Sequence, residues 1–209
     1  MRRAAGTALH PSLERRPPTG YRLVRFGETA SVSNGGAWVR IIVQAGERPD
    51  EAAAHAQWAK EFEGLEAELR ERMLFVLDPE GTPVGTATAW YYRDGDVGQR
   101  GGRVHWVSVV PAAQGKGLAK LLLGEVLRKL RSLHSGGPTH LVTHTQAARA
   151  IAMYLEVGFE PGPLNPDGSV GHRRLDAKES PEEAAGWAEL VALGLPVEFR
   201  VVRWQGVHV

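Results

Sequence analysis

The sequence predicts an α+β protein in which helices cover both faces of a mixed, mostly antiparallel sheet. Segments of alternating apolar and polar residues come first, separated by tight turns, and this is typical of antiparallel strands. A strand–helix–strand–helix unit follows them, and such a crossover makes a parallel pair. Together the two observations indicate three layers, with helices on either side of one sheet.

The elements can be assigned in chain order from periodicity and from the residues that end each segment. Strands are expected at residues 21–26, 73–78, 84–92, 103–110, 140–145, 172–176 and 197–204. Helices are expected at residues 49–72, 117–133, 147–157 and 180–194. Residues 38–44 remain ambiguous, because their β-branched content favours a strand whereas their length also fits a short helix.

Composition and charge narrow the class of protein. The 209 residues suit one domain, and 25 basic against 24 acidic residues are too balanced for a nucleic-acid binder. The absence of cysteine excludes disulfides, thiolate metal sites and a cysteine nucleophile. No apolar run approaches the ~20 residues of a membrane span. We expect a cytoplasmic protein with a loose basic tail at 1–18 and one domain at 19–209, whose residues 160–209 extend the sheet less regularly.

The segment from Ser108 to Leu123 carries the clearest chemistry. A strand ends at a proline there, and a turn containing Gly115 and Gly117 then opens a long helix. The unpaired N–H groups of a first helical turn attract anions, and glycines let a phosphate approach the main chain. This is neither a P-loop, because leucine follows Gly117, nor a Rossmann fingerprint, because Lys120 stands where the third glycine belongs.

Two motifs resemble those of the GCN5-related N-acetyltransferase (GNAT) superfamily. The first is a strand ending in Val-x-Pro followed by Gln-x-x-Gly-x-Ala, and it comprises Val109, Pro111, Gln114, Gly117 and Ala119. The second is a helix ending in Tyr-x-x-x-Gly-Phe, and it comprises Tyr154, Gly158 and Phe159. Both stand in the family's order and on the expected strand–helix units. The resemblance covers about residues 21–159 and implies the GNAT fold, whose central strands splay apart.

The resemblance implies a site for acetyl-CoA as co-substrate. Its diphosphate would be wrapped by main-chain N–H groups of Gln114, Gly115, Lys116, Gly117, Leu118 and Ala119. Its pantetheine arm would pair with the strand edge at Val107 and Val109, where the N–H of Val109 would polarise the thioester carbonyl. Many members of the family carry an asparagine where this chain has Ala147, so Thr145 or Gln146 would replace that polar contact.

The catalytic expectations also rest on the resemblance. Tyr154 stands where the family often keeps its general acid, and a phenol is protonated at neutral pH. His105 is the candidate base, on the expectation that residues 105, 107 and 109 share one face of the strand. His144 is the substitute base or a substrate contact. The alternative interpretation is that Tyr154 packs the core and that His105 is structural.

These expectations lead to an acetyl-CoA-dependent N-acetyltransferase in which an acceptor amine attacks the thioester directly. Trp90 and Tyr92, near two aspartates, would suit a cationic amine, small molecule or peptide, although core aromatics beside a solvated turn explain them equally. No metal, nucleic-acid or membrane partner is expected, and a homodimer stays open. The alternative function is a non-catalytic acyl-CoA-binding sensor.

Overall fold

The computed structural model describes residues 1–91, 101–143, 147–160, 188 and 192 of the chain. Within them a six-stranded sheet has the order β1-β6-β5-β4-β3-β2. Its strands are β1 (Arg2–Arg3), β2 (Arg22–Arg25), β3 (Met73–Leu77), β4 (Pro83–Tyr91), β5 (Gly102–Val109) and β6 (Thr139–His140). The helices are α1 (Gly36–Gln44), α2 (Glu51–Phe62), α3 (Glu66–Arg72), α4 (Leu118–Leu133) and α5 (Ala148–Glu156).

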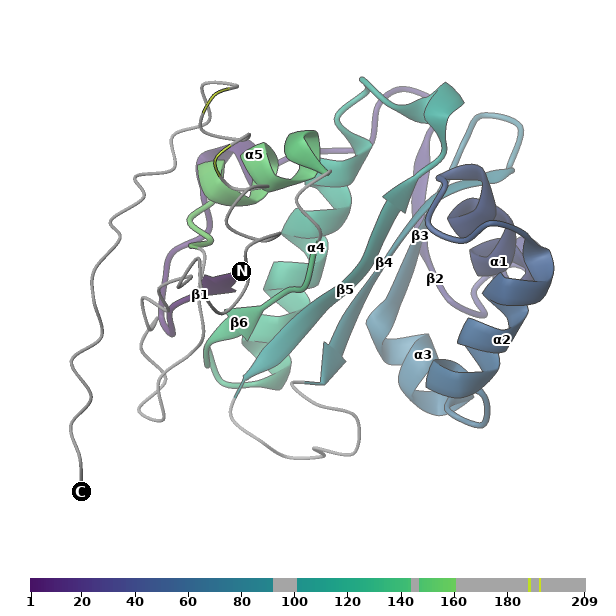
Figure 1. Cartoon of the computed structure of the whole chain (residues 1–209), viewed down its shortest axis with the longest axis horizontal. Helices are drawn as coiled ribbons and strands as arrows, with labels where there is room; N and C mark the ends of the chain where they lie inside the picture. Colours follow the sequence, from purple (N-terminus) through teal and green to yellow (C-terminus); the bar gives the residue numbers. More distant parts are fainter. Residues whose placement is uncertain (92–100, 144–146, 161–187, 189–191, 193–209) are drawn as a thin grey trace.

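Helices lie on both sides of the sheet, as the sequence predicts. In Figure 1, α4 and α5 lie on one side of the central strands, and α1, α2 and α3 lie on the other. All neighbouring strands pair antiparallel except β5 and β6, which pair in parallel across the α4 connection. The predicted mixed, mostly antiparallel sheet in three layers is therefore confirmed.

Two helical segments differ in detail from the expectation. The ambiguous segment 38–44 belongs to helix α1, which buries Trp38, Ile41 and Ile42 at the three- and four-residue spacing of one helical face. The single helix expected at 49–72 is two helices, α2 and α3. The chain between them passes through Gly64 at φ +78°, a left-handed conformation that ends α2 and favours glycine.

The strand expected at 140–145 is much shorter than its sequence suggests. Only Thr139 and His140 are in β6, and Val142 just beyond them is 84% exposed. Residues 144–146 lie outside the described residues, as do the strands expected at 172–176 and 197–204. Only isolated helical positions are described within 180–194.

The first residues of the chain are part of the fold, so the prediction of a loose basic tail at 1–18 is wrong over most of its length. Strand β1 pairs with β6 at the sheet edge, and Arg3 is buried. The 3₁₀ helix η1 (Pro11–Leu13) then carries Leu13, with no exposed surface, into the core. The carbonyl of Leu13 accepts a hydrogen bond from Arg128 on α4. Basic composition alone did not distinguish a solvated arm from an edge strand.

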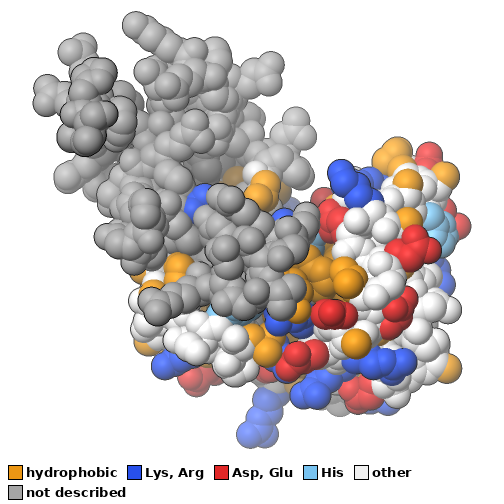
Figure 2. Space-filling model, turned by 90° about the horizontal axis from the view of Figure 1, so that it is seen from below, with side chains coloured by type: hydrophobic (Ala, Val, Ile, Leu, Met, Phe, Trp, Pro, Cys, Tyr) orange, Lys and Arg blue, Asp and Glu red, His pale blue; other side chains and the backbone are white. Residues whose placement is uncertain are grey.

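The surface carries no single dominant charge on the face drawn in Figure 2. Acidic and basic side chains are interspersed over the described part of that face, in keeping with the formal net charge of +1. Among the described residues, none of the helices is long and apolar enough to cross a membrane.

The buried position of Leu13 predicts a stability effect. Leu13→Ala removes a fully buried side chain between η1 and α4 and should lower the free energy of unfolding by about 2–5 kcal/mol. The matched control Val142→Ala, at an exposed position, should change it by less than about 0.5 kcal/mol. Urea unfolding of both variants measures this, and equal, small effects would contradict the docking of the first residues.

Candidate active site

The central strands separate where the sequence predicts a slot. Strand β5 pairs with β6 at Gly102 and Arg103 and, among the described residues, nowhere later along its length. The second half of β5, which contains Val107 and Val109, is paired with β4 on its other side. In the described part of the chain, this half of β5 therefore has no strand partner on the β6 side, where an extended ligand could add as a strand.

The turn between β5 and α4 has the backbone that a phosphate site needs. Gly115 and Gly117 both have φ +78°, which side chains of L-residues rarely adopt. A Cβ at Gly115 would meet nothing within 4 Å, so the main chain is open there. Gly117 is the N-cap of α4, and the first N–H groups of that helix have no partner within the helix.

The side chains of the same turn have structural contacts of their own. Gln114 Nε2 donates to the carbonyl of Val109 at 3.1 Å and so ties the turn to the end of β5. Lys116 Nζ donates to the carbonyl of Ala112 at 3.2 Å, and Leu118 is buried in the core. These residues can therefore contact an anion chiefly through their main-chain N–H groups, as the resemblance implies.

Arg15 is a neighbour of this turn that sequence reasoning missed. Its guanidinium Nη1 lies 2.7 Å from the position of a Cβ at Gly117, and its Nε donates to the carbonyl of Ser12 at 3.0 Å. The first residues of the chain thus bring a cation to the start of α4. Arg15 and Gly117 are about a hundred positions apart in the sequence, so local patterns cannot predict their contact.

An irregularity in β5 corrects the expected face of the strand. Thr86 pairs with Ser108 and Thr88 with His105, so β5 has one residue more than β4 between the two pairs. Trp106 within this bulge has φ +50°. The extra residue breaks the alternation, so His105 shares a face with Ser108, and residues 105, 107 and 109 do not share one.

The bulge also brings two consecutive side chains to one carboxylate. Glu61 Oε2 on α2 lies 2.5 Å from His105 Nε2 and accepts a hydrogen bond of 2.7 Å from Trp106 Nε1. Burial by itself would raise the pKa of Glu61. The hydrogen bond and charge of His105 oppose it, and with the hydrogen bonds from Trp106 and Gln57 they lower that pKa to about 2. Glu61 is therefore ionised at neutral pH. Sequence reasoning missed Glu61 because nothing in α2 marks it.

Tyr154 lies on α5 and is 6% exposed. Its ring packs against Phe159 with 5.8 Å between centroids, and Gly158 at φ +86° ends the helix beside it. Burial raises the pKa of the phenol, and the negative charge of Glu47 raises it further. The phenol therefore stays protonated at neutral pH, which is the state that a general acid needs before it acts.

Of the residues predicted to bind the acceptor, the structure describes Trp90 but not Tyr92 or His144. Trp90 is 2% exposed and packs edge-on against Phe62 at 5.1 Å between centroids, so it belongs to the aromatic core rather than to the wall of an open mouth. Alternation along β4 does not distinguish a side chain in the core from one in the wall of an open site. Tyr92, His144 and the proposed cofactor contacts Thr145 and Gln146 lie outside the described residues.

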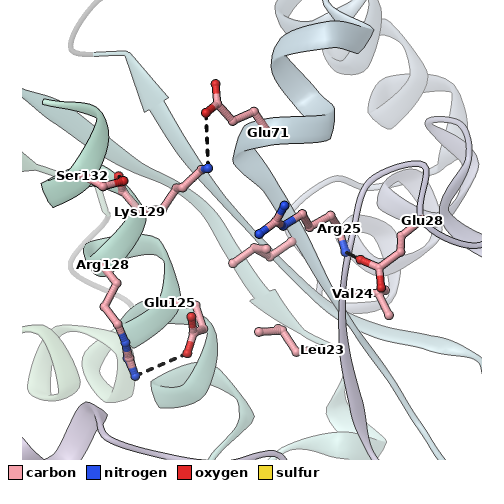
Figure 3. Close-up of a pocket in the computed structure, with 10 residues that line it drawn as sticks. Leu23, Val24, Arg25, Glu28, Glu71, Glu125, Arg128, Lys129 and Ser132 are labelled. Atoms are coloured by element: carbon pink, nitrogen blue, oxygen red, sulfur yellow. Dashed lines mark hydrogen bonds and ion pairs between the residues drawn. The ribbon is translucent and has the colours of Figure 1, made fainter.

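A cavity of about 510 Å³ opens elsewhere, between α4 and the outer strands β2 and β3 (Figure 3). Lys129 Nζ on α4 lies 3.3 Å from Glu71 Oε1 on α3 across the cavity, and Arg128 Nη2 lies 3.3 Å from Glu125 Oε1 on α4 itself. Neither His105 nor Tyr154 lines it, so we do not place the chemistry there. The described residues include no group of three or more metal-ligating side chains suited to an ion.

Known proteins share a sequence profile and a fold with this chain. The sequence profile of the acetyltransferase (GNAT) family matches residues 38–159, more than half of the chain. An uncharacterized protein of Mycobacterium leprae is 40% identical over 63 residues, which make up 30% of this chain and 16% of that protein. The chain thus aligns with only a small part of that relative.

Solved structures share the fold at low sequence identity. A GCN5-related N-acetyltransferase from Sphaerobacter thermophilus has a TM-score of 0.53 and 16% identity, over 70% of this chain and 45% of that one. The protein yncA from Salmonella typhimurium, solved with its cofactor acetyl-CoA, has a TM-score of 0.52 and 20% identity, over 75% and 88% of the two chains. These likenesses confirm the predicted fold.

The lowered pKa of Glu61 predicts a pH dependence of stability. Because its pKa is depressed from 4.5 to about 2 in the folded protein, its contribution is complete above pH 4.5 and is lost as the pH falls through about 2. In Glu61→Gln the free energy of unfolding should therefore depend less steeply on pH in this window, by up to about 1.4 kcal/mol per pH unit. Urea titrations between pH 2 and 7 measure the difference. The control Glu63→Gln, at an exposed position of the same helix end, should follow the wild type. Parallel curves for Glu61→Gln and the wild type would contradict the lowered pKa of Glu61.

Proposed function

The chain belongs to the acetyltransferase (GNAT) family, and we propose that it transfers the acetyl group of acetyl-CoA to a primary amine by direct attack. The observation that carries this proposal is the open edge of β5 directly beside the glycine turn that begins α4. An extended thioester chain and a diphosphate fit these two features in the order in which they occur along acetyl-CoA.

The binding half of the proposal is supported by the turn itself. Main-chain N–H groups from Gln114 to Ala119 would hold the diphosphate, with the positive φ of Gly115 and Gly117 providing close approach. Arg15 would add a cation from the first residues of the chain. Val107 and Val109 would pair with the pantetheine arm. The acetyl-CoA bound to yncA, a protein of the same fold, is consistent with this choice of acyl donor.

The proposed reaction needs a proton acceptor for the amine and a proton donor for the thiolate. The amine nitrogen bonds to the thioester carbonyl carbon, and the carbon–sulfur bond breaks. His105 takes the proton that the amine loses, and Tyr154 delivers one to the departing thiolate. The buried, protonated phenol of Tyr154 and the carboxylate beside His105 support these roles. The N–H of Val109 would polarise the carbonyl.

The first test concerns the acyl donor. Gly117→Glu places a carboxylate where the diphosphate should lie, and it should abolish acetyl-CoA binding measured by calorimetry. The substitution also strains a left-handed position, at roughly 1–2 kcal/mol. The matched control Gly81→Glu carries similar strain at φ +83° in the β3–β4 hairpin and should bind normally. Unchanged affinity in Gly117→Glu would refute the site.

The second test separates an enzyme from a sensor. Tyr154→Phe retains the packed ring and removes only the proton donor, so kcat should fall by roughly 10²-fold while acetyl-CoA affinity and Tm hold. Thiol release with a panel of primary amines measures kcat. Undiminished turnover would make Tyr154 a core residue. Tight acetyl-CoA binding by a wild type that no amine turns over would favour the non-catalytic sensor.

A further inference from the structure

Two neighbouring residues of β5, the candidate base His105 and Trp106, both contact one carboxylate on α2. Glu61 Oε2 lies 2.5 Å from His105 Nε2 and 2.7 Å from Trp106 Nε1. Consecutive residues of a regular strand point to opposite faces, so they cannot share a carboxylate on one side of the sheet. The bulge in β5, with Trp106 at φ +50°, removes that restriction.

The second carboxylate oxygen is fixed as well. Gln57 Nε2, one turn earlier on α2, donates to Glu61 Oε1 at 2.6 Å. Arg48 Nη2 in turn donates to Gln57 Oε1 at 2.7 Å, and its guanidinium lies 4.9 Å from the centre of the Trp106 ring. The contacts form a closed circuit through α2, β5 and the connection between α1 and α2. Both oxygens of Glu61 are therefore oriented before any substrate arrives.

We propose that Glu61 is the positioning residue of His105, an inference that rests on the proposed function. Its carboxylate holds Nε2 of the ring and so fixes the tautomer and the orientation in which His105 takes the proton from the acceptor amine. The negative carboxylate then stabilises the imidazolium that this transfer creates. The hydrogen bond from Trp106 helps to keep Glu61 ionised, so that the proton stays on His105.

The charges around His105 determine the direction of the expected effect. Glu61 from α2 is the nearest and favours the imidazolium. Arg103, on β5 itself, opposes it from 3.5 Å between Nη2 and Nε2, and Arg48 adds a more distant positive charge from the α1–α2 connection. Removing the negative charge of Glu61 takes away the stabilising charge at 2.5 Å while Arg103 and Arg48 stay in place, so the imidazolium should lose its proton at lower pH.

The experiment compares kcat/KM against pH for the wild type and for Glu61→Gln, which retains the shape of the side chain and removes its charge. The midpoint of the acidic limb should move down by about one pH unit, and the plateau should fall roughly tenfold because the ring is less firmly oriented. Glu61→Asp, which retains the charge, should restore part of the shift. Glu63→Gln should leave the profile unchanged. A Glu61→Gln profile that superimposes on that of the wild type would overturn the proposal.

A second measurement does not depend on turnover. The ring ¹⁵N signals of His105, identified by their loss in His105→Gln, report its ionisation and tautomer in the wild type and in Glu61→Gln. A lowered titration midpoint and a mixture of tautomers in Glu61→Gln support the positioning role, and identical titrations exclude it. A His105→Gln variant with an undiminished acidic limb would instead refute the proposed base, and so the failure of the proposed function is distinguishable from the failure of this inference.

Discussion

The extra residue in β5 is the constraint on which the candidate site depends. It lies where β5 has already left β6, and it interrupts the alternation of side chains between His105 and Ser108. Without it, His105 and Trp106 would point to opposite layers and could not meet Glu61 together. A left-handed Trp106 is an unfavourable conformation for a bulky residue. The partly buried hydrogen bonds of His105 and Trp106 to Glu61 offset part of that cost.

Local patterns in the sequence predicted the features that are themselves local. The glycine turn before α4, the amphipathic face of that helix and the glycine after Tyr154 depend on residues a few positions apart, so periodicity and turn chemistry suffice to find them. Local patterns could not predict contacts between residues that lie far apart in the sequence. Glu61 and His105 are 44 positions apart, and nothing in the Ala- and Glu-rich α2 distinguishes Glu61 from its neighbours. The two interpretations of Trp90 stayed open in the sequence because alternation indicates a face of a strand and not how deeply that face is buried.

The first residues of the chain connect the sheet edge with the candidate diphosphate turn. β1 completes the edge beside β6, η1 packs Leu13 against α4, and Arg15 follows at Gly117. This segment, which is basic in composition, therefore contacts three separate parts of the fold: β6, α4 and the turn at Gly117. The fold determines where its basic side chains lie, with Arg3 buried and Arg15 beside Gly117. The net charge of the chain carries no information on these positions.

The pairing of β1 with β6 also has a consequence for the order in which the protein forms. Arg2 lies opposite His140, so β1, which precedes the other described strands along the chain, can pair only after β6, the last of them, has been made. Contacts of such sequence separation are made late, because the loop between them must be closed first. During synthesis the antiparallel strands β2 to β5 can pair with their neighbours, while the edge that β1 and β6 complete stays open until residue 140 emerges. β1 thus precedes the other described strands along the chain and joins the described sheet among the last of them.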